Sequence, residues 1–149
     1  MKKLSVYAIV AGAAADMVGT LLVSILITSV AGGLLLSQGV AEDEIGTRLA
    51  ADARVLVWSV ALGLAASLAG GVVAARIAKH REPTHGASAG AVGLVLSTIS
   101  AVVSPVTLPT WYVFVGYGLV VPMAALGGLL GKVWNDRQER DATRPGPHA

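Results

Sequence analysis

The residue with the strongest claim to chemistry in this chain is Asp16, which lies inside an apolar run from Leu4 to Leu36. Apart from Tyr7, it is the only ionisable side chain in that run. A carboxyl group inside a membrane costs several kcal/mol unless it is protonated, paired or hydrated. No lysine or arginine is expected at its depth, so we expect it to hydrogen-bond hydroxyl groups. The candidate partners are Ser67, Ser97, Ser100 and Tyr117.

Asp16 belongs to a row of small and polar residues spaced four apart, namely Gly12, Asp16, Thr20, Ser24 and Thr28. Four residues overshoot a helical turn by about 40°, so a row of five winds through about 160°. Part of the row must therefore face a second helix or a cavity. Two interpretations follow: a proton- or cation-binding carboxylate with the three hydroxyl residues as a polar path, or a neutral packing residue.

Other chemistry finds little support in the sequence. His80, His85 and His148 match no metal-binding spacing, and the chain has no cysteine, so we expect no metal and no cofactor. There is no nucleophile motif of the G-x-S-x-G type and no glycine-rich phosphate loop with lysine. The acidic run Glu42–Glu44 is typical of a solvated loop. We therefore expect a protein that is not an enzyme.

Composition indicates an integral membrane protein. Of its 149 residues, 54% are hydrophobic and 13% are charged, whereas soluble domains carry about 25% charged residues. The length allows about four spans of ~20 residues and leaves no room for a separate soluble domain. The positive charges flank apolar runs, so we expect the lipid bilayer as the partner and no nucleic acid.

We predict an all-α protein with four transmembrane helices in one domain, residues 1–134, followed by a disordered cytoplasmic tail, residues 135–149. Gly32–Gly33 is the expected end of the first span, and Pro122 is expected to kink the fourth. Between the first two spans we expect a solvated loop, with a short amphipathic helix as the alternative. The predicted spans are residues 5–31, 54–78, 86–103 and 111–133.

The distribution of lysine and arginine predicts the topology. Nine of the eleven lie in segments that would be cytoplasmic if both termini are: Lys2, Lys3, Arg76, Lys79, Arg81, Lys132, Arg137, Arg140 and Arg144. The positive-inside rule favours this arrangement. A cleavable signal ending at Ala15 is the alternative, and it would invert the later loops.

Helices in lipid associate through small residues that allow close backbone approach, since the hydrophobic effect does not act between them. We expect such packing at Gly63, Ser67, Gly70, Gly71, Gly86, Gly90, Gly93, Gly127 and Gly131. The basic residues of the turn between the second and third spans are expected to set topology or meet lipid headgroups; they are Arg76, Lys79 and Arg81.

This second hairpin carries a family resemblance. Gly70-Gly71, Ala74 and Arg76 form a GG-x-x-A-x-R run, and His85-Gly86 with Gly90 form H-G-x-x-x-G. Together they resemble the hairpin of small bacterial four-helix membrane proteins of the YrzE-like kind. The resemblance implies a four-helix fold in the bacterial inner membrane and supplies no catalytic residues.

Two functions fit these observations. The first is a structural or accessory membrane protein that associates with itself or with a larger complex through small-residue helix faces. The second is a small proton- or cation-coupled transporter or channel that uses Asp16. The absence of a clear inverted repeat argues mildly against a complete transporter.

Overall fold

The computed structural model describes residues 4–103 and 107–142, and all regular structure in these ranges is helical. The helices are α1 (Val6–Ile27), a π-helical segment (Thr28–Gly32), α2 (Gly33–Ser37), α3 (Glu42–Ala51), α4 (Ala53–Ala78), α5 (Glu82–Val103) and α6 (Thr110–Ala142). Four continuous stretches are long and apolar enough to cross a membrane: Val6–Ser37, Ala53–Ala78, Glu82–Val103 and Thr110–Ala142. The predicted all-α class is confirmed, and the chain has the make-up of a multi-pass membrane protein.

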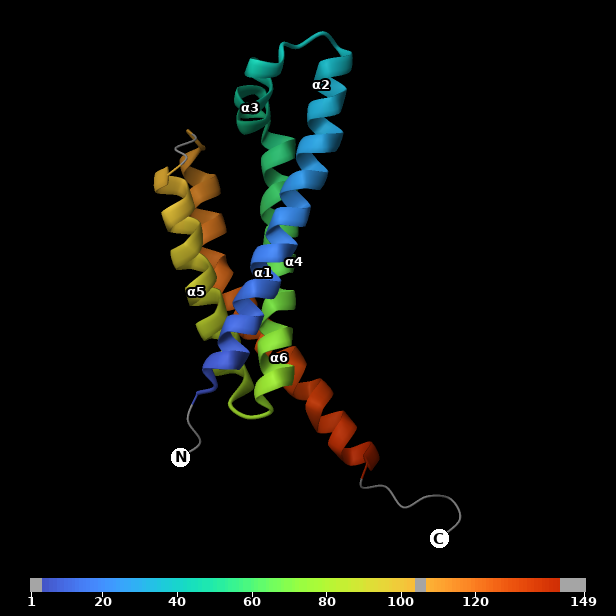
Figure 1. Ribbon diagram of the computed structural model, residues 1–149, viewed down its shortest axis with the longest axis vertical. Helices are drawn as coiled ribbons and strands as arrows, with labels where there is room; N and C mark the ends of the chain where they lie inside the picture. Colours follow the sequence, from blue (N-terminus) through green and yellow to red (C-terminus); the bar gives the residue numbers. More distant parts are fainter. Residues whose placement is uncertain (1–3, 104–106, 143–149) are drawn as a thin grey trace.

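The helices form two pairs that meet at one end of the molecule (Figure 1). α1 lies along α4, α5 lies along α6, and α4 also packs against α6. The pairs are in contact near the turn between α4 and α5, which we call the hairpin end. They diverge toward the end that carries α2 and α3, which we call the α3 end. The fold therefore has one closed end and one splayed end.

Large and small side chains are distributed in the opposite way from a soluble protein. Among the described residues, the buried hydrophobic ones are Leu56 and eight alanines, including Ala74 and Ala124, whereas large side chains such as Leu22 and Phe114 are exposed. Small inner faces let backbones approach closely, and a large apolar exterior suits contact with lipid. The bundle is held by close backbone packing.

Side-chain caps and a left-handed residue mark the helix ends. Ser5 caps α1, where its hydroxyl accepts from the Ala8 amide at 3.3 Å. Asp52 caps α4 by accepting from the Arg54 amide at 2.8 Å. α4 ends at Lys79, whose φ of 51° takes the backbone into the left-handed region. These residues mark the start of α1 and both ends of α4.

The first helical stretch does not end at Gly32–Gly33, as the sequence predicted. Gly33 keeps a right-handed helical φ of −60°, and the chain passes through the π-helical segment into α2. The stretch ends at Ser37, just before Gly39, whose φ of 83° is left-handed. A glycine ends a helix by adopting the left-handed conformation, and here only Gly39, of these three, does so.

Residues 42–51 form helix α3, so the prediction of a solvated loop is wrong here and the amphipathic alternative is the one that the structure has. Three acids occupy the first turn, where they favourably meet the helix dipole. Arg48 pairs with Glu44 at 3.3 Å. Ile45 and Leu49 are half-buried on the opposite side, and Ile45 packs toward Gly32. The short segment gains its order from this contact.

Helix α6 is longer than the span that the sequence predicted. It remains helical through residues 135–142, where the sequence predicted a disordered tail. Asn135 is buried, and its side-chain amide donates to the Ala75 carbonyl oxygen at 3.3 Å, which ties this part of α6 to α4. Pro122 lies inside the helix, and Figure 1 shows the two halves of α6 running in different directions. The predictions at Lys2, Lys3, Arg144 and His148 lie outside the described residues.

Candidate functional site

The site is built around Asp16, whose side chain lies inside the bundle and is only 7% exposed. Among the described residues it has no ion-pair partner. The Ser67 hydroxyl on α4 donates to Asp16 Oδ1 at 3.0 Å. Thr20, one turn further along α1, lines the same cavity as Asp16. The predicted bond to Ser67 is therefore present.

Ser67 offers two arrangements of hydrogen bonds. Its Oγ lies 3.0 Å from Asp16 Oδ1 and 3.3 Å from the Gly63 carbonyl oxygen. A serine hydroxyl has one proton to donate and two lone pairs. It can donate to an ionised Asp16, or donate to Gly63 while it accepts from a protonated Asp16. The same geometry therefore accommodates both protonation states of the carboxyl group.

Asp16 borders a cavity of about 280 Å³ that all four long helices line. Its other carboxylate oxygen, Oδ2, faces Gly93 on α5, where an added Cβ would come within 2.7 Å of it. Glycine at this position thus makes room for the carboxylate. The polar residues of the wall are Asp16, Thr20, Ser59, Ser67, Ser97, Tyr112 and Tyr117.

A second cavity of about 250 Å³ continues toward the α3 end. It shares Thr20, Ser59, Gly63 and Tyr112 with the first cavity and adds Ser24, Thr28 and the α3 residues Leu49 and Ala50. The hydroxyl residues of the predicted row, Thr20, Ser24 and Thr28, therefore line two adjoining cavities, which together we call the polar route. This route runs from beneath α3 to Asp16.

On the other side of Asp16 the helices are in close contact. One turn toward the hairpin end, a Cβ on Gly12 would lie 2.7 Å from Ala74 Cβ on α4 and 3.1 Å from Ala89 Cβ on α5. α6 closes the same region, because Ala124 brings its carbonyl oxygen against both Gly71 and Gly86. The polar route therefore does not continue past Asp16 toward the hairpin end.

Most of the predicted packing residues make such contacts inside the chain. A Cβ at any of them would come closer than 3.0 Å to an atom of a neighbouring helix, which real Cβ atoms do not do; these are Gly70, Gly71, Gly86, Gly90, Gly127 and Gly131. Gly63 differs, since a Cβ there would meet nothing within 4 Å. The prediction of a packing role for Gly63 is corrected: it lines the polar route because α4 and α6 have diverged at this level.

The three basic residues at the hairpin end have two distinct roles. The Arg76 guanidinium carbon lies 4.6 Å from the centre of the Trp134 ring, a cation–π contact between α4 and α6. Lys79 and Arg81 both have left-handed backbone conformations, with φ of 51° and 46°. These two residues therefore shape the tight turn itself.

His85 connects this turn to the start of α1. It is fully buried, its Nε2 accepts from the Ser5 amide at 2.9 Å, and its Nδ1 donates to the Arg81 carbonyl oxygen at 3.1 Å. His85 therefore ties the start of α5 to the start of α1 through hydrogen bonds. Both ring nitrogens are occupied, and in residues 4–103 and 107–142 no group of three potential metal ligands occurs.

Sequence reasoning missed two residues of the site, Ser59 and Tyr112. Ser59 lies one further four-residue step before Gly63 in the α4 row, so extending that row would have found it. Tyr112 lies near the start of α6 and lines both cavities. Gly128, whose added Cβ would lie 2.6 Å from the Glu82 carbonyl oxygen, was likewise missed as a packing residue.

Comparison with known proteins finds no match among protein-family models, curated proteins or solved structures. The resemblance of the Gly70–Gly90 segment to the YrzE-like proteins stays a prediction. The fold and the site define the class: an all-α protein with four potential membrane-crossing helices and one buried carboxyl group at the end of a polar route.

Proposed function

We propose that this protein is a small carrier that binds a proton or a small monovalent cation at Asp16. The observation that carries the proposal is the position of Asp16. Its buried carboxyl group lies where the polar route through the splayed helices ends against glycine-packed helices. An intramembrane acid in such a place marks an ion or proton pathway by default.

The chemistry of the site supports binding that is reversible. Ser67 can bond both the ionised and the protonated carboxyl group, so neither state leaves a buried polar atom unpaired. Hydroxyl oxygens from Thr20, Ser59 and Tyr112 supply further neutral ligands along the wall. One negative charge among neutral oxygens suits a single positive charge.

A carrier fits better than an open channel because the route is closed on one side. The contacts of Gly12, Gly71 and Gly86 leave no space toward the hairpin end. An ion bound at Asp16 would need the hairpin end to loosen before it could leave there. Alternating opening of the two ends of a bundle around one fixed site is how carriers work.

The orientation and the compartment are part of the proposal. The lysine and arginine distribution favours a cytoplasmic position for both termini and the hairpin end. The bacterial inner membrane is the location that the resemblance to the YrzE-like proteins implies. The α3 end then faces outward. In this orientation the structure corresponds to the outward-open state of the carrier.

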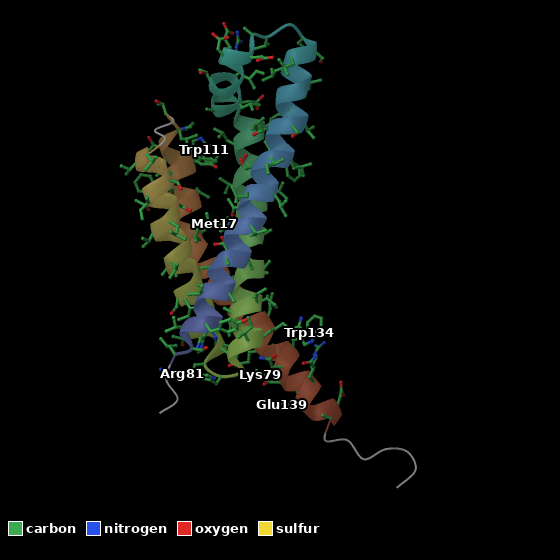
Figure 2. The ribbon with its side chains drawn as sticks, in the orientation of Figure 1. Met17, Lys79, Arg81, Trp111, Trp134 and Glu139 are labelled. Carbon is green, nitrogen blue, oxygen red and sulfur yellow. The ribbon has the colours of Figure 1, made fainter. Side chains whose placement is uncertain are left out.

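A second candidate is an accessory, non-enzymatic subunit of a larger membrane complex. It is favoured by a lateral cavity of about 240 Å³ lined by residues of α1 and α5, among them Asp16 and the exposed Leu21 and Leu96. Met17, which Figure 2 labels, also borders this cavity. A partner's helix could fill this gap. The small-residue faces first expected to make such contacts are largely used inside the chain, so this function would rest on the gap instead.

The test is a flux assay on liposomes that contain the purified protein. An imposed membrane potential should drive proton or sodium flux through the wild type, and Asp16→Asn should lower it at least tenfold because the amide cannot titrate. Asp136→Asn, which removes a carboxylate outside the cavities, is the matched control and should keep the flux. Equal flux from Asp16→Asn and the wild type would sink the carrier proposal.

The accessory function makes a different prediction. Mass determination of the intact assembly from native membranes would then show a foreign subunit in fixed stoichiometry, and liposomes with the purified protein would show no flux of either ion. The carrier proposal expects flux from the protein alone.

A further inference from the structure

A second feature lies at the hairpin end, on the outside of the bundle and away from Asp16. There α6 crosses α4 and continues beyond it, and Figure 2 places Trp134 on this projecting part. The two helices leave a groove of about 560 Å³ between them. Val72 lines it from α4, and residues between Leu130 and Asp141 line it from α6.

The groove changes from apolar to charged along its length. Leu130 and Val133 come first, Trp134 follows, and Arg137 and Asp141 lie furthest along α6. At 1.5 Å per residue, Leu130 and Asp141 are separated by about 16 Å along the helix. Tryptophan is typical of the boundary between the hydrocarbon and headgroup layers. The order of side chains therefore matches the order of acyl chain and headgroup in a phospholipid.

Two cations flank Trp134. The Arg76 guanidinium carbon lies 4.6 Å from the Trp134 ring centre, and Arg137 follows Trp134 by three residues, so it lies near the same face of α6. Guanidinium groups bind phosphate oxygens in pairs and tolerate contact with aromatic rings. Arg137 thus offers donors to a phosphodiester inside the groove, and Arg76, which does not line the groove, lies beside it at the Trp134 ring.

An acidic residue, Asp141, lies in the groove close to Arg137. Asp141 lies one turn beyond Arg137, yet among the described residues neither has a hydrogen-bond or ion-pair partner. An arginine and an aspartate four residues apart often pair with each other. Here both lie at the charged end of the groove, and both are open to a ligand.

We propose that this groove is a binding site for a phospholipid with a primary-amine headgroup. The phosphate lies between Arg76 and Arg137, the ammonium group is bound by Asp141, and the acyl chains run along Val72, Leu130 and Val133. Two positive groups and one negative group complement a phosphate and an amine better than they complement a headgroup without an amine. Basic pockets between helices at this membrane surface are known lipid-binding features. The site goes beyond the proposed function and does not depend on it.

The experiment is native mass spectrometry of the full-length protein in mild detergent, titrated with phosphatidylethanolamine, phosphatidylglycerol or phosphatidylcholine of identical acyl chains. Phosphatidylethanolamine should bind most tightly. Arg137→Gln should weaken binding of phosphatidylethanolamine and phosphatidylglycerol by about tenfold, since it removes a charged hydrogen-bond donor to the phosphate. Asp141→Asn should abolish the preference for phosphatidylethanolamine and leave phosphatidylglycerol binding intact.

Lys132→Gln is the matched control, because it removes a cation of α6 that does not line the groove. It should leave the affinity for all three lipids unchanged. Equal weakening by Lys132→Gln and Arg137→Gln would overturn the site, since lipid would then respond to overall charge. Tighter binding of phosphatidylglycerol than of phosphatidylethanolamine by the wild type would overturn the amine assignment. Because Arg137 and Lys132 are exposed, neither variant should impair folding.

Discussion

Gly127 and Gly116 lie on the same helix and offer a direct comparison of packed and open glycines. A Cβ added to Gly127 would overlap the Leu68 carbonyl oxygen and lie 2.9 Å from the Leu68 carbonyl carbon and 3.0 Å from the Val72 nitrogen. Carbon atoms in good contact are about 3.5–4.0 Å apart. Gly127→Ala must therefore push α6 away from α4 by about 1 Å. At Gly116 an added Cβ would meet nothing within 4 Å.

The expected magnitudes follow from these contacts. Overpacking a tight interface costs about 1–3 kcal/mol, and replacing glycine by alanine in a helix returns up to about 1 kcal/mol. Because the clash at Gly127 is with backbone atoms, the upper part of this cost applies, about 2–3 kcal/mol. After the return of about 1 kcal/mol, Gly127→Ala should lower the free energy of unfolding by about 1–2 kcal/mol. Gly116→Ala should leave it unchanged or raise it by up to about 1 kcal/mol.

The assay is reversible unfolding in mixed micelles of increasing SDS fraction, followed by circular dichroism. A loss of 1.4 kcal/mol corresponds to about a tenfold change in the ratio of folded to unfolded protein, so the two variants should separate clearly. If Gly127→Ala is as stable as Gly116→Ala, the close packing of α6 on α4 is wrong, and with it the closed end of the polar route.

Two further predictions concern the hairpin end. His85→Ala should lower the free energy of unfolding by about 2–4 kcal/mol, because it opens a cavity and leaves the Ser5 amide without its acceptor. His85→Gln should recover part of this loss. In His85→Ala, the amides in the first turn of α1 should exchange hydrogen faster, which would report the lost hydrogen bond to Ser5. Lys79→Gly should raise the free energy of unfolding by about 1 kcal/mol because glycine has no steric penalty at a φ of 51°. Lys79→Val is its control and should lower stability, and equal stability of these two variants in the SDS assay would contradict the left-handed conformation.

Much of the fold could be predicted because a long apolar run in a membrane protein forms a helix. A segment with no water around it must satisfy its own backbone, so each run forms a helix. The boundaries were less predictable. Gly32–Gly33 resembles a stop signal, yet glycine also fits inside a helix when it keeps a right-handed conformation. α3 is stabilised by its contact with Gly32, which no local pattern reveals.

The candidate site was partly predictable for the same reason. The four-residue rows through Asp16 and Ser67 placed both residues on inward faces, and the structure joins them at 3.0 Å. Which members of a row pack and which line a cavity depends on where the helices diverge. Gly63 and Gly71 belong to one row, but Gly71 meets the Ala124 carbonyl oxygen and Gly63 meets open space. This difference arises from the splay of the helix pairs, which the sequence does not encode locally.

The central claim is that the polar route gives access to Asp16 from the α3 end, and a single-cysteine experiment tests it most directly. The chain has no native cysteine, so Gly63→Cys provides a unique thiol within the route, and Leu22→Cys provides one on the lipid-facing surface, where Leu22 is 62% exposed. A charged, membrane-impermeant thiol reagent added on the α3 side of liposomes should modify Gly63→Cys and not Leu22→Cys. Failure of Gly63→Cys to react from that side, or reaction from the hairpin side alone, would contradict the account.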